Sequence, residues 1–156
     1  MKLRILIIGK PVKKYIQEGI AEYLKMISRY QRIEIQTIRE EQVKNGKSII
    51  EILKKEGERL LAKLTDRDYV IALDMNGEAF SSVKMANFMQ ERFNHTNHNI
   101  IFIIGGPHGL DAQVKNRADF KLSLSKMTFP HELCLLILLE QLYRSLNISS
   151  GGKYHK

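Results

Sequence analysis

Two loops in the C-terminal half of the chain combine residue types that could hold a small ligand. An apolar run over residues 100–104 ends at Gly105-Gly106-Pro107-His108-Gly109, and a second run ends in Ser125-Lys126-Met127-Thr128-Phe129-Pro130. Glycine lets the backbone approach a ligand closely, and loops beyond the carboxyl ends of parallel strands are the usual ligand sites of open α/β sheets. These two loops are therefore the first candidate site.

The spacing of these residues argues against several familiar sites. The chain has no G-x-G-x-x-G and no Gly-Lys-Ser/Thr triplet, and a tight strand-to-helix turn explains the glycines equally well on these residues alone. The five histidines show no spacing that gathers three or four metal ligands, so no metal is expected. The chain has a single cysteine, Cys134, which excludes a disulfide framework. This cysteine lies in an apolar helical run, which argues against thiol catalysis.

Strand-like and helix-like patterns alternate along the whole chain. The alternation predicts an α/β fold with a mainly parallel five- to six-stranded sheet and helices on both faces. A capping box at Ser48 starts one helix, which continues through a poorly placed Gly57, and Asp74-Met75-Asn76-Gly77 is expected to be a turn after a strand. Strands are expected at residues 3–8, 33–36, 69–73, 100–104 and roughly 120–123, and helices at 16–27, 48–64, 81–93 and 111–118 and from 131 onward.

Length and composition bound the class of protein. At 156 residues and 44% hydrophobic, with no linker-like stretch, the chain is expected to be one domain over residues 1–156. No apolar run approaches the length of a membrane span, and Met1-Lys2 leads directly into a short strand instead of a signal peptide. A soluble, cytoplasmic protein is expected.

The charge distribution points to an anionic partner. The chain has 25 basic and 17 acidic side chains, a net charge of +8, and residues 1–32 alone hold eight basic and two acidic side chains. Nucleic acid is the leading candidate for such a basic region, although a merely solvated surface would have the same composition.

Four stretches together resemble one family of methyltransferases. The pieces VIALDMNGEAFSS, IIGGPHGL, LSLSKMTFPHELCLLILLEQLYRS and the terminal KYHK are similar to the bacterial large-subunit ribosomal RNA pseudouridine N3-methyltransferases, a single-domain branch of the SPOUT methyltransferases. The resemblance covers essentially the whole chain. It implies a C-terminal trefoil knot over approximately residues 69–156, which the general rule against threaded chains would not predict.

The resemblance also implies a cofactor and the residues that hold it. S-adenosylmethionine would bind in a bent form between three loops, and Gly105 would leave room for its adenosine because it has no side chain. Core packing is the alternative role for the two leucines in the set. The implied cofactor contacts are Leu73, Gly105, Leu124, Ser125, Lys126, Met127, Thr128 and Phe129.

The implied reaction is methyl transfer to N3 of a pseudouridine in 23S ribosomal RNA, in the assembled ribosome. Positioning of the methyl carbon against N3 would supply much of the rate. The implied substrate contacts are Tyr154, His155 and Lys156, which could stack on a base, exchange a proton and meet a phosphate. A frayed chain end is the alternative for this tail.

The last helical run predicts self-association. Every residue from 133 to 139 is apolar, so the helix is hydrophobic around more than one stripe, and a homodimer would bury the remainder. Enclosure within one subunit is the alternative.

Three classes of function compete: the methyltransferase, a catalytically silent RNA-binding domain, and a doubly wound nucleotide-binding enzyme. Within the first class, ribose or tRNA-base methylation by another SPOUT enzyme is the runner-up. The pairing of SKMTFP with GGPHG favours the methyltransferase, because a silent binder would not need both loops and a dinucleotide enzyme should carry its glycines after the first strand.

Overall fold

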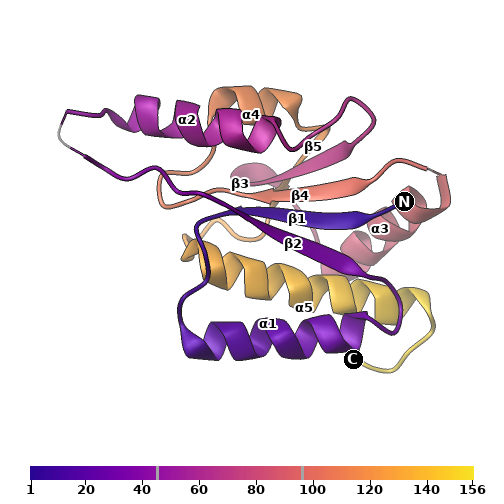
Figure 1. Cartoon of the computed structure of the whole chain (residues 1–156). Coiled ribbons are helices and arrows are strands. Elements are labelled where there is room, and N and C mark those ends of the chain that lie inside the picture. Colours follow the sequence, from indigo (N-terminus) through magenta and orange to yellow (C-terminus); the bar gives the residue numbers. More distant parts are fainter. Residues whose placement is uncertain (45, 96) are drawn as a thin grey trace.

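The computed structural model describes residues 1–44, 46–95 and 97–156 and has the expected α/β architecture (Figure 1). Every registered strand pair is parallel, and the strand order is β2-β1-β4-β3-β5. The elements are β1 Leu3–Ile8, α1 Lys14–Ile27, β2 Ile33–Ile38, α2 Ile49–Leu61, β3 Tyr69–Ala79, α3 Ser82–His95, β4 Ile100–Ile104, α4 Ala112–Arg117, β5 Phe120–Ser123 and α5 His131–Ser149.

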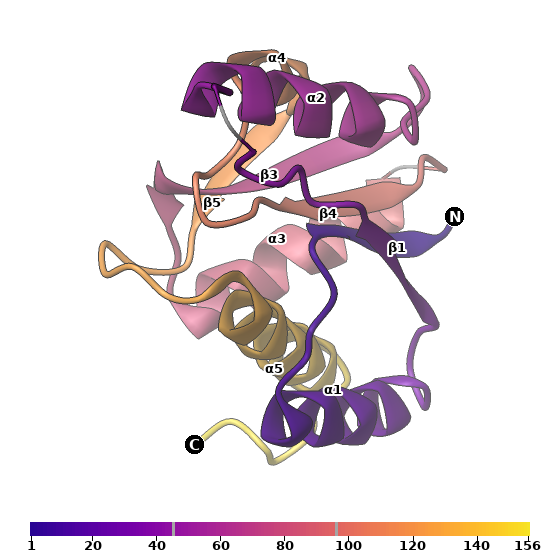
Figure 2. The ribbon, with the colours of Figure 1, turned by 60° about the vertical axis from the view of Figure 1, so that its left-hand side comes forward.

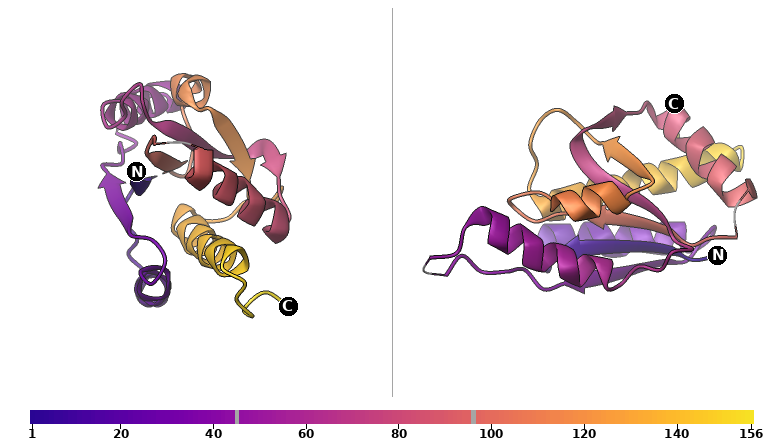
Figure 3. Two further views of the ribbon diagram at one scale, coloured as in Figure 1. Left: turned by 90° about the vertical axis from the view of Figure 1, so that its right-hand side faces the viewer. Right: turned by 90° about the horizontal axis from the view of Figure 1, so that it is seen from above.

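Helices cover both faces of the sheet, as the alternating pattern predicts (Figures 2 and 3). One apolar core joins the sheet to α1, α3 and α5, with Phe102 fully buried within it. The second core joins the opposite face to α2 and α4 through Leu60 and Val114. All five residues of the central strand β4 are buried because side chains on both of its faces meet helices.

Two local features of α2 have clear causes. The Ser48 side chain accepts a hydrogen bond from the Glu51 backbone N–H at 3.2 Å, which confirms the predicted helix start. A Cβ on Gly57 would lie 2.9 Å from Cβ of Asp111, the N-cap residue of α4. The glycine that looks poorly placed for a helix therefore allows α2 to pack closely against α4.

The expected end of β3 at Asp74-Met75-Asn76-Gly77 is wrong. The strand runs on to Ala79, and its pairing with β5 shifts so that Leu122 is opposite both Leu73 and Glu78. The intervening residues bulge out of the ladder, and the Asn76 N–H donates to Asp74 Oδ1 at 3.0 Å within the bulge. Turn residues at this point re-aim the strand without reversing it.

Within the described residues, no helix is long and apolar enough to cross a bilayer. The trefoil knot over residues 69–156 stays a prediction of the family resemblance.

An ion-pair cluster around Glu41 links the chain just after β2 to α2. Glu41 forms ion pairs with Lys47 and with Arg59, and Lys55 Nζ lies 3.9 Å from Glu41 Oε1. The hydrogen bonds from Lys47 and Arg59 lower the pKa of Glu41 to about 2. The next buried carboxyl, Glu56, accepts the Glu41 backbone N–H, and burial raises its pKa.

Replacing Glu41 with glutamine is expected to lower the thermal unfolding midpoint near neutral pH. Because the folded-state pKa is below the unfolded value of 4.5, the carboxylate stabilises the fold above that pH and loses this effect as the pH falls toward 2. Circular dichroism melts should therefore show a gap between wild type and Glu41→Gln at pH 7 that closes under acid. Glu58→Gln, on an exposed position of α2, is the control, and a gap that stays constant down to pH 3 would contradict the assignment.

Candidate functional site

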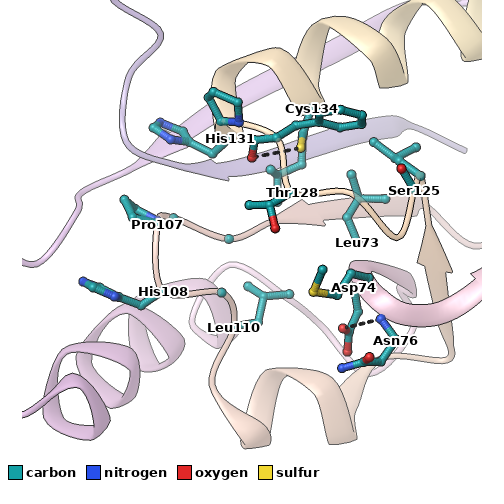
Figure 4. A pocket seen from close by; sticks show the side chains of 18 of the residues that line it. Leu73, Asp74, Asn76, Pro107, His108, Leu110, Ser125, Thr128, His131 and Cys134 are labelled. Carbon is teal, nitrogen blue, oxygen red and sulfur yellow. Dashed lines mark hydrogen bonds between the residues drawn. The ribbon is translucent and has the colours of Figure 1, made fainter.

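A pocket of about 790 Å³ lies beside the bulge of β3, where β4 and β5 end and α5 begins (Figure 4). Its position agrees with the general rule for ligand sites in open α/β sheets. Its size falls in the range of about 300–1,000 Å³ that is typical for small-molecule sites. Its walls are the β3 bulge at residues 73–76, the loop at residues 104–110, and the loop at residues 124–125 with 127–131; Lys115 and Cys134 complete it.

The loop after β4 folds back on itself. Gly106 and Gly109 form an isolated antiparallel bridge, and Gly109 has a φ of +85°, in the left-handed region that favours glycine. A Cβ on Gly105 would lie 2.6 Å from the Gly109 carbonyl oxygen. The turn itself therefore leaves no space for a side chain at Gly105, and the expectation that this glycine also makes room for a ligand stays a prediction.

The loop before α5 is fastened by its serines. Ser123 Oγ donates to the Ser125 carbonyl at 3.2 Å, and Ser125 Oγ accepts the Met127 N–H at 2.9 Å. The Thr128 side chain points toward the middle of the pocket (Figure 4), whereas Met127 is 75% exposed. Short-range hydrogen bonds thus give this irregular segment a defined shape beside the pocket.

Seven of the eight cofactor residues expected from the family resemblance line this pocket together. The exception is Lys126, which lines a neighbouring hollow of about 400 Å³ with Met75, Asn76 and Gly77. The seven are Leu73, Gly105, Leu124, Ser125, Met127, Thr128 and Phe129.

Several lining residues were not expected from the sequence. Asp74 and Lys115 are the clearest case, since Lys115 Nζ lies 3.4 Å from Asp74 Oδ2 and the Asp74 side chain is only 9% exposed. The pair ties the β3 bulge to α4. No local signal could have revealed it, because the two residues are 41 positions apart. His131 also lines the pocket, and its Nε2 is buried without a hydrogen-bond partner.

Cys134 lines the pocket near the first turns of α5. Its Sγ lies 3.9 Å from the Phe129 carbonyl oxygen, and burial raises the pKa of the thiol. Such an environment favours the protonated, unreactive form. Among the described residues, no group of three or more His, Cys, Asp or Glu side chains is placed to hold a metal ion.

The C-terminal tail does not line the pocket of its own chain. The Tyr154 N–H donates to Asn147 Oδ1 at 3.0 Å, and its hydroxyl donates to Glu140 Oε1 at 3.2 Å. Arg144 Nη1 lies 3.2 Å from His155 Nδ1, and the Arg144 guanidinium lies over the Tyr154 ring. The tail is therefore packed on α5 and is not frayed at Tyr154 and His155.

The environment of Tyr154 favours the protonated phenol. Burial, hydrogen bonding with Tyr23 and the negative charge of Glu140 raise the pKa of Tyr154 to about 12. At neutral pH the residue is a phenol that donates a hydrogen bond. Its ring makes an edge contact with Tyr143 at 4.8 Å between centroids.

The distance between tail and pocket follows from helix geometry. The pocket meets α5 at His131 and Cys134, and the tail contacts begin at Glu140, about 9 Å beyond Cys134 along the axis at about 1.5 Å per residue. One helix thus separates the two predicted parts of the site.

Known proteins support the fold and the family. A family model described as "Predicted SPOUT methyltransferase" matches residues 1–155. Proteins named "Ribosomal RNA large subunit methyltransferase H" from Carboxydothermus hydrogenoformans and Symbiobacterium thermophilum are 46% and 44% identical to this chain, with full coverage of both sequences.

Solved structures agree with this fold at low sequence identity. A tRNA (m1G37) methyltransferase from Aquifex aeolicus is 17% identical, with a TM-score of 0.55 over 92% of this chain and 70% of that one. A probable methyltransferase from Bordetella pertussis Tohama I is 10% identical, with a TM-score of 0.58 over 93% and 94%. The chain belongs to the SPOUT methyltransferase family.

Proposed function

We propose that this protein methylates large-subunit ribosomal RNA, with S-adenosylmethionine as donor and N3 of a 23S pseudouridine in the assembled ribosome as acceptor. The observation that carries the proposal is the meeting of the β3 bulge and two loops in one pocket, in a chain that matches the ribosomal RNA methyltransferases over its whole length. The working unit would be a single domain over residues 1–156 with its knot at approximately 69–156. A ribosomal substrate implies a cytoplasmic location.

The pocket fits S-adenosylmethionine in size and chemistry. Leu73, Leu124 and Phe129 would provide apolar walls, while Ser125 and Thr128 lie in a loop that offers backbone donors and acceptors for a nucleoside. Gly105 would act by shaping its loop, and Met127 and Lys126 would lie at the rim, toward the second hollow. When bound, the cofactor supplies a methyl group already activated on a sulfonium.

The protein's own contribution would then be chiefly positioning. The Asp74–Lys115 pair fixes the β3 bulge, and the turn between Gly106 and Gly109 fixes the loop after β4. A rigid pocket holds the donor in one orientation, which makes the encounter with the acceptor nearly unimolecular.

The substrate contacts would come from a second copy of the chain. Leu133 and Ile137 are only half-buried in one chain, on the helix that also carries Glu140 and Arg144. An antiparallel, two-fold pairing of α5 helices would bury these residues and bring the tail of one chain to the pocket of the other. Tyr154, His155 and Lys156 would then contact the target nucleotide beside the partner's cofactor.

The reaction itself can be tested with labelled S-adenosylmethionine and free ribosomal RNA, 50S subunits or 70S ribosomes. We expect label in 70S ribosomes, mapped by nucleoside mass spectrometry to the N3 position of a pseudouridine. Label in tRNA or on a ribose would favour another SPOUT activity, and ribosome binding without transfer would favour a silent RNA-binding domain.

The cofactor site can be tested with Thr128→Arg, which adds bulk and positive charge where a cationic sulfonium would bind. Affinity for S-adenosylmethionine in calorimetry should fall by roughly a hundredfold, because overpacking and like-charge repulsion both oppose binding. The control is Val83→Arg, at an exposed position on α3. Unchanged affinity in a folded Thr128→Arg protein would remove this loop from the site.

The shared site predicts complementation between two inactive variants. A chain lacking residues 153–156 should keep its cofactor affinity and its dimeric mass, twice 18.1 kDa, while methyl transfer falls by orders of magnitude because positioning is lost. Heterodimers of this chain with Thr128→Arg, isolated with two affinity tags, should regain about half of the wild-type rate per dimer, since one complete site forms. Inactive heterodimers would indicate that each tail serves its own chain, and a monomeric mass at micromolar concentration would exclude the pairing.

A further inference from the structure

A short basic segment connects β1 to α1. Residues 10–15, here called the 10–15 segment, read Lys-Pro-Val-Lys-Lys-Tyr and contain no acidic side chain. All three lysines are exposed, Tyr15 is 62% exposed, and the Lys13 ammonium lies 6.0 Å from the centroid of the Tyr15 ring. The segment therefore presents cations and an aromatic ring to solvent.

The segment begins at the edge of the cofactor pocket. It follows Gly9, where a Cβ would lie 3.1 Å from Nε2 of the pocket residue His131. The strands β1 and β4 pair in parallel, so the backbone leaves both strands on the same side of the sheet. The segment then passes the start of α5 (Figure 2). The segment therefore lies beside the part of the pocket wall that His131 forms.

The segment has a defined conformation. Glu132, in the first turn of α5, is 6% exposed, and its Oε2 accepts the backbone N–H of Val12 at 2.9 Å and that of Lys13 at 3.5 Å. At the other end, Gln17 Nε2 donates to the Pro11 carbonyl at 2.9 Å. A buried carboxylate that receives two backbone amides anchors the segment to the same helix that forms part of the pocket wall.

The lysines of the segment are largely uncompensated. Lys14 lies 3.8 Å from Glu18, but both side chains are well exposed, so this pair is weak. Among the described residues, no carboxylate lies within ion-pair distance of Lys10 or Lys13. Phosphates neutralise such cations, and an exposed tyrosine offers a face on which an unpaired base can stack.

We infer that the 10–15 segment is an RNA-contact surface, in which Lys10 and Lys13 bind backbone phosphates and Tyr15 stacks on an unpaired base next to the cofactor pocket. This inference rests on the proposed function and extends it by naming the surface that receives the ribosomal RNA. Glu132 is a positioning residue for this surface.

The test compares two double variants with the same loss of charge. Lys10→Gln/Lys13→Gln removes the two lysines, and Lys54→Gln/Lys63→Gln removes two exposed lysines in and after α2, the helix that covers the opposite face of the sheet. Binding is measured by co-sedimentation with purified 70S ribosomes over a series of KCl concentrations. Methyl-transfer kinetics, cofactor affinity and dimer mass are measured in parallel.

The Lys10→Gln/Lys13→Gln variant should have a Kd and a KM for the ribosome that are about tenfold higher, since each exposed phosphate contact contributes modestly to binding. It should also reduce the slope of log K against log salt by about one to two. The kcat at saturating ribosome, the cofactor affinity and the dimer mass should stay unchanged, and the control pair should match wild type. Tyr15→Ala should weaken ribosome binding roughly tenfold and Tyr15→Phe should restore it, because the phenyl ring still stacks.

Equal effects of both lysine pairs, or an unchanged salt slope, would overturn the inference. A monomeric mass of the Lys10→Gln/Lys13→Gln variant would overturn the inference, because it would show that these lysines contact the other subunit. If the wild-type protein binds ribosomes but methylates no ribosomal RNA, and only the Lys10→Gln/Lys13→Gln variant loses this binding, the proposed function fails while the RNA-contact surface stands.

Discussion

The complete burial of β4 is the constraint on which the rest of the structure depends. Side chains on both faces of this central strand meet helices, so residues 100–104 form an unbroken apolar run that stops where the sheet stops. The backbone must then leave the sheet in a small space, and it does so by a turn in which the Gly109 carbonyl oxygen lies 2.6 Å from where a Cβ on Gly105 would be. The same turn forms one wall of the pocket. Packing in the core and the shape of the site therefore have one cause.

How far the sequence predicts this fold depends on how local the signals are. The bounds of β4 and β5 are correct because each is a short strand-like run between clear breaks, and the Ser48 helix start is correct because capping is local. The bulge in β3 was missed because Asp-Met-Asn-Gly is typical of a chain reversal, and only pairing with β5 on both sides shows that the strand continues. Gly57 looked unfavourable because its contact, Asp111, is far away in the sequence.

The candidate site, too, could be predicted only where its signals in the sequence are local. Glycine and polar loop residues at strand ends indicated where a ligand could lie, but Leu73 and Leu124 entered the set only through the family resemblance, since core packing explains a leucine equally well. The Asp74–Lys115 pair and the direction of the absent Gly105 side chain depend on how distant segments fold together. Family membership also excludes the doubly wound dinucleotide enzyme, which the missing glycine fingerprint after β1 had already made unfavourable.

The helix α5 connects the pocket, the basic segment and the C-terminal tail, and this arrangement motivates the proposed dimer. Its first turn carries His131 at the pocket and Glu132 at the basic segment, and its later turns hold Tyr154 and His155 through Glu140 and Arg144. A helix is rigid, so the two ends cannot approach each other within one chain. Two antiparallel copies remove this limit without any change in conformation, because the far end of one helix then lies beside the near end of the other. On the proposed function, the length of α5 would fix the separation of the cofactor and substrate groups within one chain, and the proposed dimer would bring them together.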